Sequence, residues 1–196
     1  MEKTKAIAVV GVGGQGTVLT SDILIEGLID LGYAVKKTEQ HGMSQRGGSV
    51  NCFIKYGKKV YAPLIGTQEA DVVLAFEKLE ALRWLPLLKE GGTLIVNDHE
   101  LHPVPVKMGK AKYPENAIKL LEDTVENTYV IKATEEAQMI GTIRVASIIL
   151  LGAAVKILGL EDYDWKSLIA RKVPAKFVDQ NLQAYEVGLA SVERRA

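Results

Sequence analysis

A glycine-rich turn between two differently patterned apolar segments constrains this chain more than any other feature. Residues 6–10 (AIAVV) are continuously apolar, and residues 11–16 (GVGGQG) follow them. Residues 17–31 then place leucine and isoleucine at helical spacing, Gly32 follows as a helix-ending glycine, and residues 33–37 resemble a second strand. A continuous apolar run bounded by glycine is typical of a strand buried on both faces. The order strand, glycine loop, helix, strand predicts a right-handed βαβ unit with parallel strands.

The rest of the chain continues to alternate strand-like and helix-like segments. Residues 49–56 and 60–64 flank a turn, and we expect them to pair as a β-hairpin. The other expected strands are 70–76, 93–96, 129–133 and a short edge strand at 104–108; the expected helices are 77–89 (closed by Gly91 and Gly92), 114–123, 135–158 with a break near Gly141, 165–171 and 175–191. The predicted fold class is α/β: a Rossmann-like, mostly parallel sheet with a β-hairpin insertion and a helical C-terminal segment. We expect one domain over residues 1–196, with the sheet region at 5–133 and the helical segment, 134–196, packed on it.

Composition excludes several classes of function. The 24 basic and 24 acidic residues balance to zero net charge, so we expect no nucleic-acid partner. One cysteine, Cys52, can form neither an internal disulfide nor a four-cysteine metal site, which fits a reducing compartment. The longest uncharged apolar stretch, residues 145–155, is shorter than the roughly 20 residues of a membrane span and predicts a helix buried in the core or in a subunit interface. With no export signal recognisable, a cytoplasmic location and no membrane partner are expected.

The first candidate site is the glycine loop. It matches the G-x-G-x-x-G pattern between a strand and a helix, where free N–H groups at the helix start attract anions. Dinucleotide binding also requires an acid after the second strand; Glu39 is the nearest, but Lys36 and Lys37 precede it. The alternative is that the glycines only allow close packing. The candidate ligand- or partner-binding residues here are Gly11, Gly13, Gly14, Gln15 and Gly16.

A second polar loop follows the second strand, and in a parallel sheet it lies at the same carboxyl edge, where ligands bind. Its candidate residues are Glu39, Gln40, Ser44, Gln45, Arg46, Gly47 and Gly48. Arg46 is suited to bind a phosphate or carboxylate bidentately. His41 is the one candidate catalytic residue, as a general base, although no second catalytic group supports it and a loop histidine more often only hydrogen-bonds. We interpret His99 and His102 as part of an exposed loop and expect no metal site.

The residues in these loops resemble a known family. GVGGQG at 11–16, Arg46-Gly47-Gly48 before a strand, and Ala70-Asp71 at the start of another are similar to the gamma-type domain of 2-oxoacid:ferredoxin oxidoreductases. The form QHGMSQRGG at 40–48 most resembles the small (beta) subunits that belong to indolepyruvate ferredoxin oxidoreductases. The resemblance extends over roughly residues 5–192.

The resemblance implies a cytoplasmic enzyme complex that oxidatively decarboxylates an arylpyruvate on thiamine diphosphate, passes electrons through [4Fe-4S] clusters to ferredoxin and transfers the acyl group to coenzyme A. The chain lacks the family's thiamine diphosphate and magnesium motif and has a single cysteine. Thiamine diphosphate, Mg and the clusters are therefore expected on a large (alpha) partner subunit, without which this chain is inactive. Its glycine loops would face that partner or coenzyme A. Two alternatives stay open: an NAD(P)-binding Rossmann oxidoreductase that uses residues 11–16, and a non-catalytic assembly module.

Overall fold

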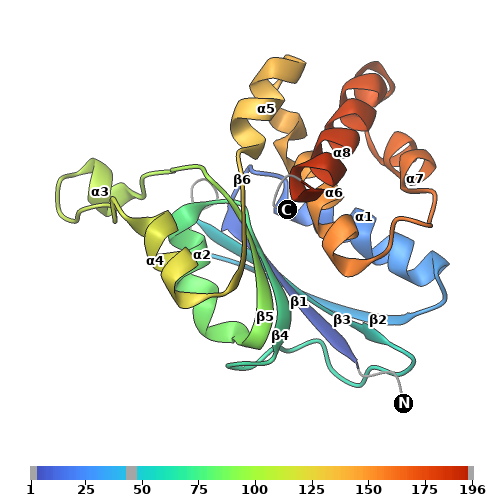
Figure 1. The fold of residues 1–196 in the computed structure, drawn as a ribbon, viewed down its shortest axis with the longest axis horizontal. Coiled ribbons are helices and arrows are strands. Elements are labelled where there is room, and N and C mark those ends of the chain that lie inside the picture. Colours follow the sequence, from blue (N-terminus) through green and yellow to red (C-terminus); the bar gives the residue numbers. More distant parts are fainter. Residues whose placement is uncertain (1–3, 43–47, 194–196) are drawn as a thin grey trace.

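The sheet has six strands in the order β2-β3-β1-β4-β5-β6 (Figure 1). The computed structural model describes residues 4–42 and 48–193. The strands are β1 (Lys5–Val12), β2 (Ala34–His41), β3 (Ser49–Gly57), β4 (Ala70–Ala75), β5 (Leu88–Asn97) and β6 (Asn127–Ile131). β1, β4, β5 and β6 pair in parallel, whereas β3 is antiparallel to both of its neighbours, β1 and β2. The sheet is therefore mostly parallel, as the sequence predicted.

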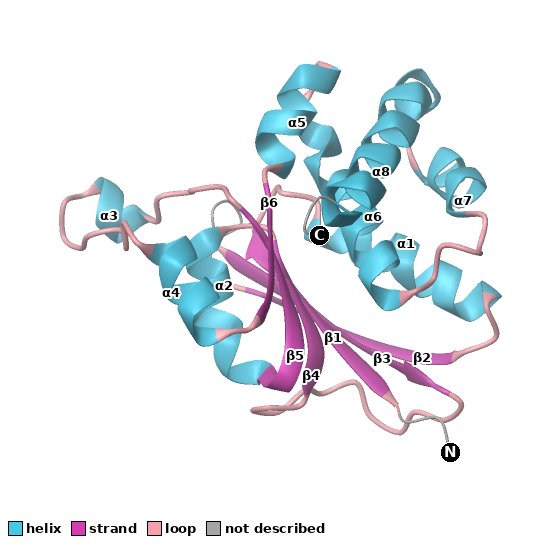
Figure 2. Ribbon diagram, in the orientation of Figure 1, coloured by secondary structure: helices cyan, strands magenta, loops and turns pink. Residues whose placement is uncertain are grey.

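Helices cover both faces of this sheet (Figure 2). One face carries α1 (Thr17–Asp30), α5 (Ala133–Ile140), α6 (Ala146–Leu158), α7 (Trp165–Lys172) and α8 (Val178–Glu193); the other carries α2 (Lys78–Trp84) and α4 (Ala117–Thr124). Strand residues alternate between the two faces, so Ile7 and Val9 join the core under α1 and α6, whereas Ala8 and Val10 join the core under α2 and α4. A short helix, α3 (Val104–Lys107), lies away from the sheet.

The expected hairpin between residues 49–56 and 60–64 is wrong. The structure does contain a hairpin, but β3 forms it with β2, and its other edge pairs with β1. Both edges of β3 are therefore occupied, and no edge is left for residues 60–64, which are mostly exposed. The predicted order of strand, glycine loop, helix and strand is confirmed, and β1 and β2 run in the same direction, but they are not neighbours because β3 lies between them.

Two further expectations differ from the structure. The segment expected as an edge strand over 104–108 contains the helix α3 instead, because prolines occupy the N-cap and the first turn, where a helix tolerates them. The helix expected over 77–89 ends at Trp84 and is followed by a 3-10 turn that contains a proline. β5 then starts at Leu88, so Gly91, at φ +69, lies inside an irregular strand and does not cap a helix.

α6 is apolar on all sides because the chain itself surrounds it. It contacts α8, α1, α5 and β5, and its residues from Ser147 to Val155 are buried. Gly188 of α8 makes the close crossing possible, since a Cβ there would lie 2.1 Å from the carbonyl oxygen of Ile149. The break predicted at Gly141 is confirmed, with φ +107 at the end of α5. None of the helices in the described ranges combines the length and apolar character that crossing a membrane requires.

Candidate functional site

The glycine loop connects the end of β1 to the start of α1, and three of its glycines are dictated by geometry. Gly14 and Gly16 have φ of +97 and +89, a region that disfavours side chains. A Cβ at Gly11 would lie 2.7 Å from the Thr17 methyl group and 2.8 Å from Cβ of Phe76. The loop is thus held close against the end of β4.

Gln15 braces this loop from inside. Its Oε1 accepts the N–H of Val12 at 2.7 Å, and its Nε2 donates to the carbonyl of Phe76 at 3.2 Å. The N–H of Gly13 donates to the carbonyl of Gly48 at 2.9 Å, which joins the loop to the residue before β3. The Gln15 amide is therefore committed to the loop, while the conformation it fixes leaves Gly14 facing open space.

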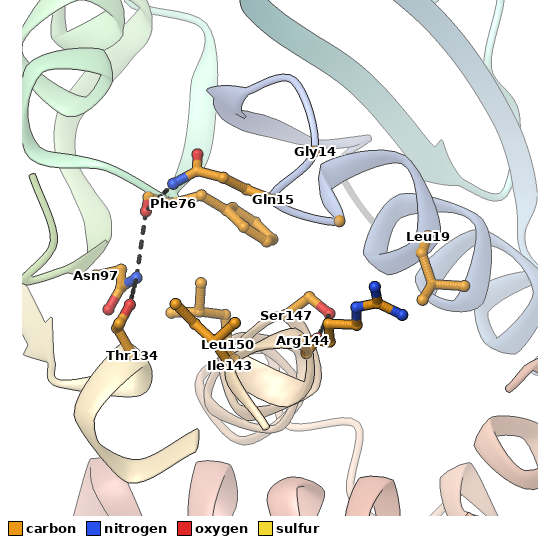
Figure 3. Close-up of a pocket in the computed structure, with 12 residues that line it drawn as sticks. Gly14, Gln15, Leu19, Phe76, Asn97, Thr134, Ile143, Arg144, Ser147 and Leu150 are labelled. Carbon is orange, nitrogen blue, oxygen red and sulfur yellow. Dashed lines mark hydrogen bonds between the residues drawn. The ribbon is translucent and has the colours of Figure 1, made fainter. Parts of the chain in front are cut away.

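A cavity of about 470 Å³ opens beside the loop (Figure 3). It lies at the carboxyl ends of β1, β4 and β5, where the covering helices change from one face of the sheet to the other. Such a crevice is the usual ligand position in an open α/β sheet. Its lining consists of Gly14, Gln15, Gly16, Leu19, Phe76, Asn97, Thr134, Ile143, Arg144, Ala146, Ser147 and Leu150.

Two helix N-termini meet at this cavity. Gly16 is the N-cap of α1, and a Cβ there would lie 2.8 Å from Cβ of Ser147 in the first turn of α6. The Thr20 hydroxyl donates to the carbonyl of Ser147 at 3.1 Å and fixes the two helices together. Each N-terminus carries a partial positive charge, although the N–H of Ala146 at the start of α6 already donates to the carbonyl of Ile143. The arrangement attracts an anion.

Arg144 adds a full positive charge. The residue is exposed, and its side chain extends past Ser147 toward Leu19 (Figure 3). Within residues 4–42 and 48–193, no hydrogen bond or ion pair engages its guanidinium group. Among the described residues, no aspartate or glutamate lines the cavity. The site therefore suits a phosphate or a carboxylate, which a guanidinium binds bidentately.

Asn97 forms the polar wall opposite. It is 3% exposed, and its Nδ2 donates to the carbonyl of Phe76 at 3.2 Å and to the Thr134 hydroxyl at 3.0 Å (Figure 3). Its Oδ1 accepts no hydrogen bond from the described residues. Asn97 thus fixes the ends of β4 and β5 to the start of α5 and keeps one acceptor unused.

The glycine loop separates this cavity from a second one of about 700 Å³, which His41 and Gly42 line on its far side. His41 is exposed, and its Nε2 lies 2.5 Å from Oε1 of Glu39. Lys37 contacts the other oxygen of Glu39 at 2.7 Å and Asp22 at 2.7 Å. The hydrogen bond from Lys37 lowers the pKa of Glu39. Burial opposes the charged form of Lys37, but its two carboxylate partners outweigh it and raise its pKa.

The structure brings only part of the predicted site together. The second cavity is lined by His41 and by the glycines at 13, 14 and 16. Glu39 and Gln40 lie beside His41 on β2, where Gln40 is exposed. Ser44, Gln45, Arg46 and Gly47 lie outside the described residues, so their role stays a prediction. The sequence missed Arg144, Ser147 and Asn97. Of these, only Asn97 could have been found, as the first polar residue after the buried strand at 93–96.

The strand order argues against the dinucleotide alternative. In that mode the ribose-binding acid ends the strand next to β1, but here β3 takes that position and β2 lies one strand further out. Glu39 on β2 therefore lies one strand spacing, about 4.8 Å, further from β1 than that binding mode requires. It is also already paired with Lys37 and His41.

We expected neither a metal site nor a reactive thiol in this chain. The described part of the chain holds no group of three or more histidine, cysteine, aspartate or glutamate residues placed to bind a metal. His102 stacks on Tyr113 with ring centroids 5.1 Å apart. Cys52 is fully buried in β3, and burial raises the pKa of its thiol, so it is a core residue.

Comparison with known proteins agrees with this architecture. Residues 6–191 match the Pyruvate ferredoxin/flavodoxin oxidoreductase family. The chain belongs to this family. Among family members, the indolepyruvate oxidoreductase subunit IorB of Thermococcus kodakarensis is 35% identical over 192 residues, which is 95% of each chain. The corresponding subunit of Archaeoglobus fulgidus is 36% identical over 188 residues, 93% of this chain and 92% of that one.

Solved structures show the same family fold. The gamma subunit of a keto/oxoacid ferredoxin oxidoreductase from Geobacter sulfurreducens superposes with a TM-score of 0.71 at 24% identity, over 97% of this chain and 99% of that one. The 2-oxoglutarate:ferredoxin oxidoreductase of Magnetococcus marinus, solved with 2-oxoglutarate, coenzyme A and succinyl-CoA bound, gives a TM-score of 0.77 at 19% identity. That match covers 100% of this chain and 32% of the Magnetococcus chain.

Proposed function

We propose that this chain is the small subunit of a thiamine-diphosphate-dependent 2-oxoacid:ferredoxin oxidoreductase that converts indolepyruvate, or another arylpyruvate, to its acyl-CoA. The observation that carries the proposal is the 35% identity to the Thermococcus subunit over 95% of both chains. A match that spans 95% of both chains supports the same subunit role.

The chemistry of the side chains supports a division of labour between subunits. A [4Fe-4S] cluster takes four cysteine thiolates, and this sequence has one cysteine, which is buried. The clusters, thiamine diphosphate and Mg are accordingly placed on the large subunit, which passes electrons to ferredoxin. The small subunit alone is inactive in this proposal.

The contribution of this chain is a binding surface at the carboxyl edge of the sheet. The cavity offers Arg144 and the N-termini of α1 and α6 to an anion. Coenzyme A carries phosphate groups of the kind such a site binds. Arg46 and Gly47, in the neighbouring loop, are proposed as further contacts to coenzyme A or to the partner. The bound coenzyme A in the Magnetococcus enzyme is in keeping with this assignment.

The test is reconstitution with the large subunit. Each subunit alone and the co-expressed pair are assayed for reduction of a low-potential acceptor that depends on a 2-oxoacid and on coenzyme A. Activity is expected only for the pair, and to be higher with indolepyruvate than with pyruvate or 2-oxoglutarate. A stable complex without electron transfer would leave only the assembly-module alternative, and a preference for an aliphatic substrate would overturn the substrate assignment.

A further inference from the structure

An arm leaves the body of the protein between β5 and α4. It consists of residues 102–112, includes α3, and extends away from the sheet (Figures 1 and 2). It follows the carboxyl end of β5 and so starts from the same edge of the sheet as the cavity. Most of its residues are exposed.

One buried carboxylate holds both ends of the arm. Oε1 of Glu77, a residue that is 1% exposed, accepts the N–H of Leu101 at 3.1 Å and the hydroxyl of Tyr113. Its Oε2 accepts the N–H of Glu80 at 2.9 Å. Burial, and then the hydrogen bond to Glu77, raise the pKa of Tyr113. A buried carboxylate is tolerated only when its hydrogen bonds are made, so the arm is a loop closed at a fixed base, of the compact kind that is frequently functional.

The surface of the arm is both basic and apolar. Val104 is 65% exposed and Met108 is 60% exposed. Lys107, Lys110 and Lys112 are exposed, and the sequence from 101 to 113 contains no acidic residue.

The three lysines of the arm are unpaired among the described residues. No ion pair joins any of them to another residue in the part of the chain that the structure describes. The acids just before the arm, Asp98 and Glu100, contact Lys78 at 3.3 and 2.8 Å. A local excess of positive charge therefore occurs on a chain whose net charge is zero.

We propose that the arm docks on the large partner subunit, at an acidic surface with an apolar recess that receives Val104 and Met108. The inference rests on the proposed function, because that function supplies the large subunit as the partner. Unpaired lysines favour an acidic counterpart through charge complementarity. Exposed apolar side chains favour a permanent partner over a transient one such as ferredoxin, since obligate interfaces are the more hydrophobic class.

The test compares two charge-reversed chains for binding to the isolated large subunit. One carries Lys107→Glu, Lys110→Glu and Lys112→Glu; the matched control carries Lys36→Glu, Lys59→Glu and Lys176→Glu at exposed sites outside the arm. The arm variant is expected to bind about tenfold more weakly or worse at low salt. Its affinity should also depend less on salt than that of the wild type. The control should bind like the wild type, and lysine-to-arginine changes in the arm should preserve affinity.

A second variant tests the apolar part. Val104→Ser with Met108→Ser should weaken binding equally at low and high salt, because no charge changes. Melting temperatures of all the isolated variants should match the wild type, since the altered side chains are exposed. If the wild type binds and both arm variants bind within twofold of it, the arm inference is wrong while the proposed function stands. If the wild type itself does not bind the large subunit, both are overturned.

Discussion

In the cavity beside the glycine loop, the polar side chains that are free to bind a ligand are not those of the glycine motif. Gln15 belongs to the motif, but its amide is already hydrogen-bonded to the backbone of Val12 and Phe76. Arg144 belongs to no motif, and it is the cation that the cavity offers. At the residue scale, we therefore propose Arg144, rather than a side chain of the loop, as the contact to an anion.

Replacing Arg144 by alanine should separate function from stability. The melting temperature should hardly change, because exposed residues without partners contribute within about 0.5 kcal/mol. In the reconstituted complex, the KM for coenzyme A should rise about tenfold, the effect of losing about 1.4 kcal/mol of binding. Arg144→Lys should recover part of the loss, since it keeps the charge but not the bidentate geometry. Arg171→Ala, on α7, serves as the control; an equal effect of both changes would contradict a specific role for Arg144.

The free energy of unfolding at acidic pH should depend on Glu39. Its pKa in the folded protein is lowered from the ordinary 4.5, chiefly by the hydrogen bond from Lys37. Its contribution is therefore complete above pH 4.5 and is lost as the pH falls through the lower, folded-state value. Urea unfolding between neutral and acidic pH should show a smaller acid loss in Glu39→Gln than in the wild type. Parallel profiles for the two proteins would show that the ion pairs of Glu39 do not contribute to stability.

At the scale of elements, the sequence predicted most strands and helices but not how the strands pair. The apolar runs at 6–10 and 70–76 correspond to β1 and β4, and the helix break at Gly141 is present. The partner of residues 49–56 could not be deduced, because the alternation of Val50, Cys52, Ile54 and Tyr56 indicates which face is buried but not which strand lies beside it. The position of Arg144 beside the glycine loop could not be deduced either, because it depends on the packing of α6 against α1, and these helices are far apart in the sequence.

The close crossing of α6 and α8 predicts that replacing a helical glycine by alanine destabilises the protein, which is opposite to the usual effect. Gly→Ala inside a helix ordinarily stabilises by about 1 kcal/mol. At Gly188 the added methyl group would lie 2.1 Å from the carbonyl oxygen of Ile149 and 3.0 Å from Cα of Gly152, so the helices must separate. We expect Gly188→Ala to lower the free energy of unfolding by about 1–3 kcal/mol, as overpacking does. Equilibrium denaturation measures it, and a gain in stability would mean that the helices are further apart than described.

At the scale of the whole molecule, the proposed function gives this chain a binding surface rather than redox groups. Its two hydrophobic cores lie on opposite faces of the sheet. The single cysteine, Cys52, lies within one of them. These features could be anticipated from composition and motifs, whereas the arm at 102–112 could not, because it is defined by its anchorage to Glu77.

The purified chain should accordingly be colourless, because the one thiol cannot hold an iron–sulfur cluster. Visible absorption and iron content measured on the isolated chain should both be at background. The co-purified complex provides the control and should be brown. Stoichiometric iron in the isolated chain would contradict the proposed division between subunits.

The position of β3 also bears on how the chain folds. β2 and β3 pair residues that are close in sequence, such as His41 with Val50, so their hairpin can form within microseconds. The central strand β1 depends on later segments on both sides, since Val9 pairs with Cys52 and with Leu74. Until those segments leave the ribosome, the apolar run in β1 has two unpaired edges and is prone to aggregate. During synthesis, the strand that anchors the glycine loop is therefore the first apolar strand of the sheet to emerge, and it waits longest for both of its neighbours.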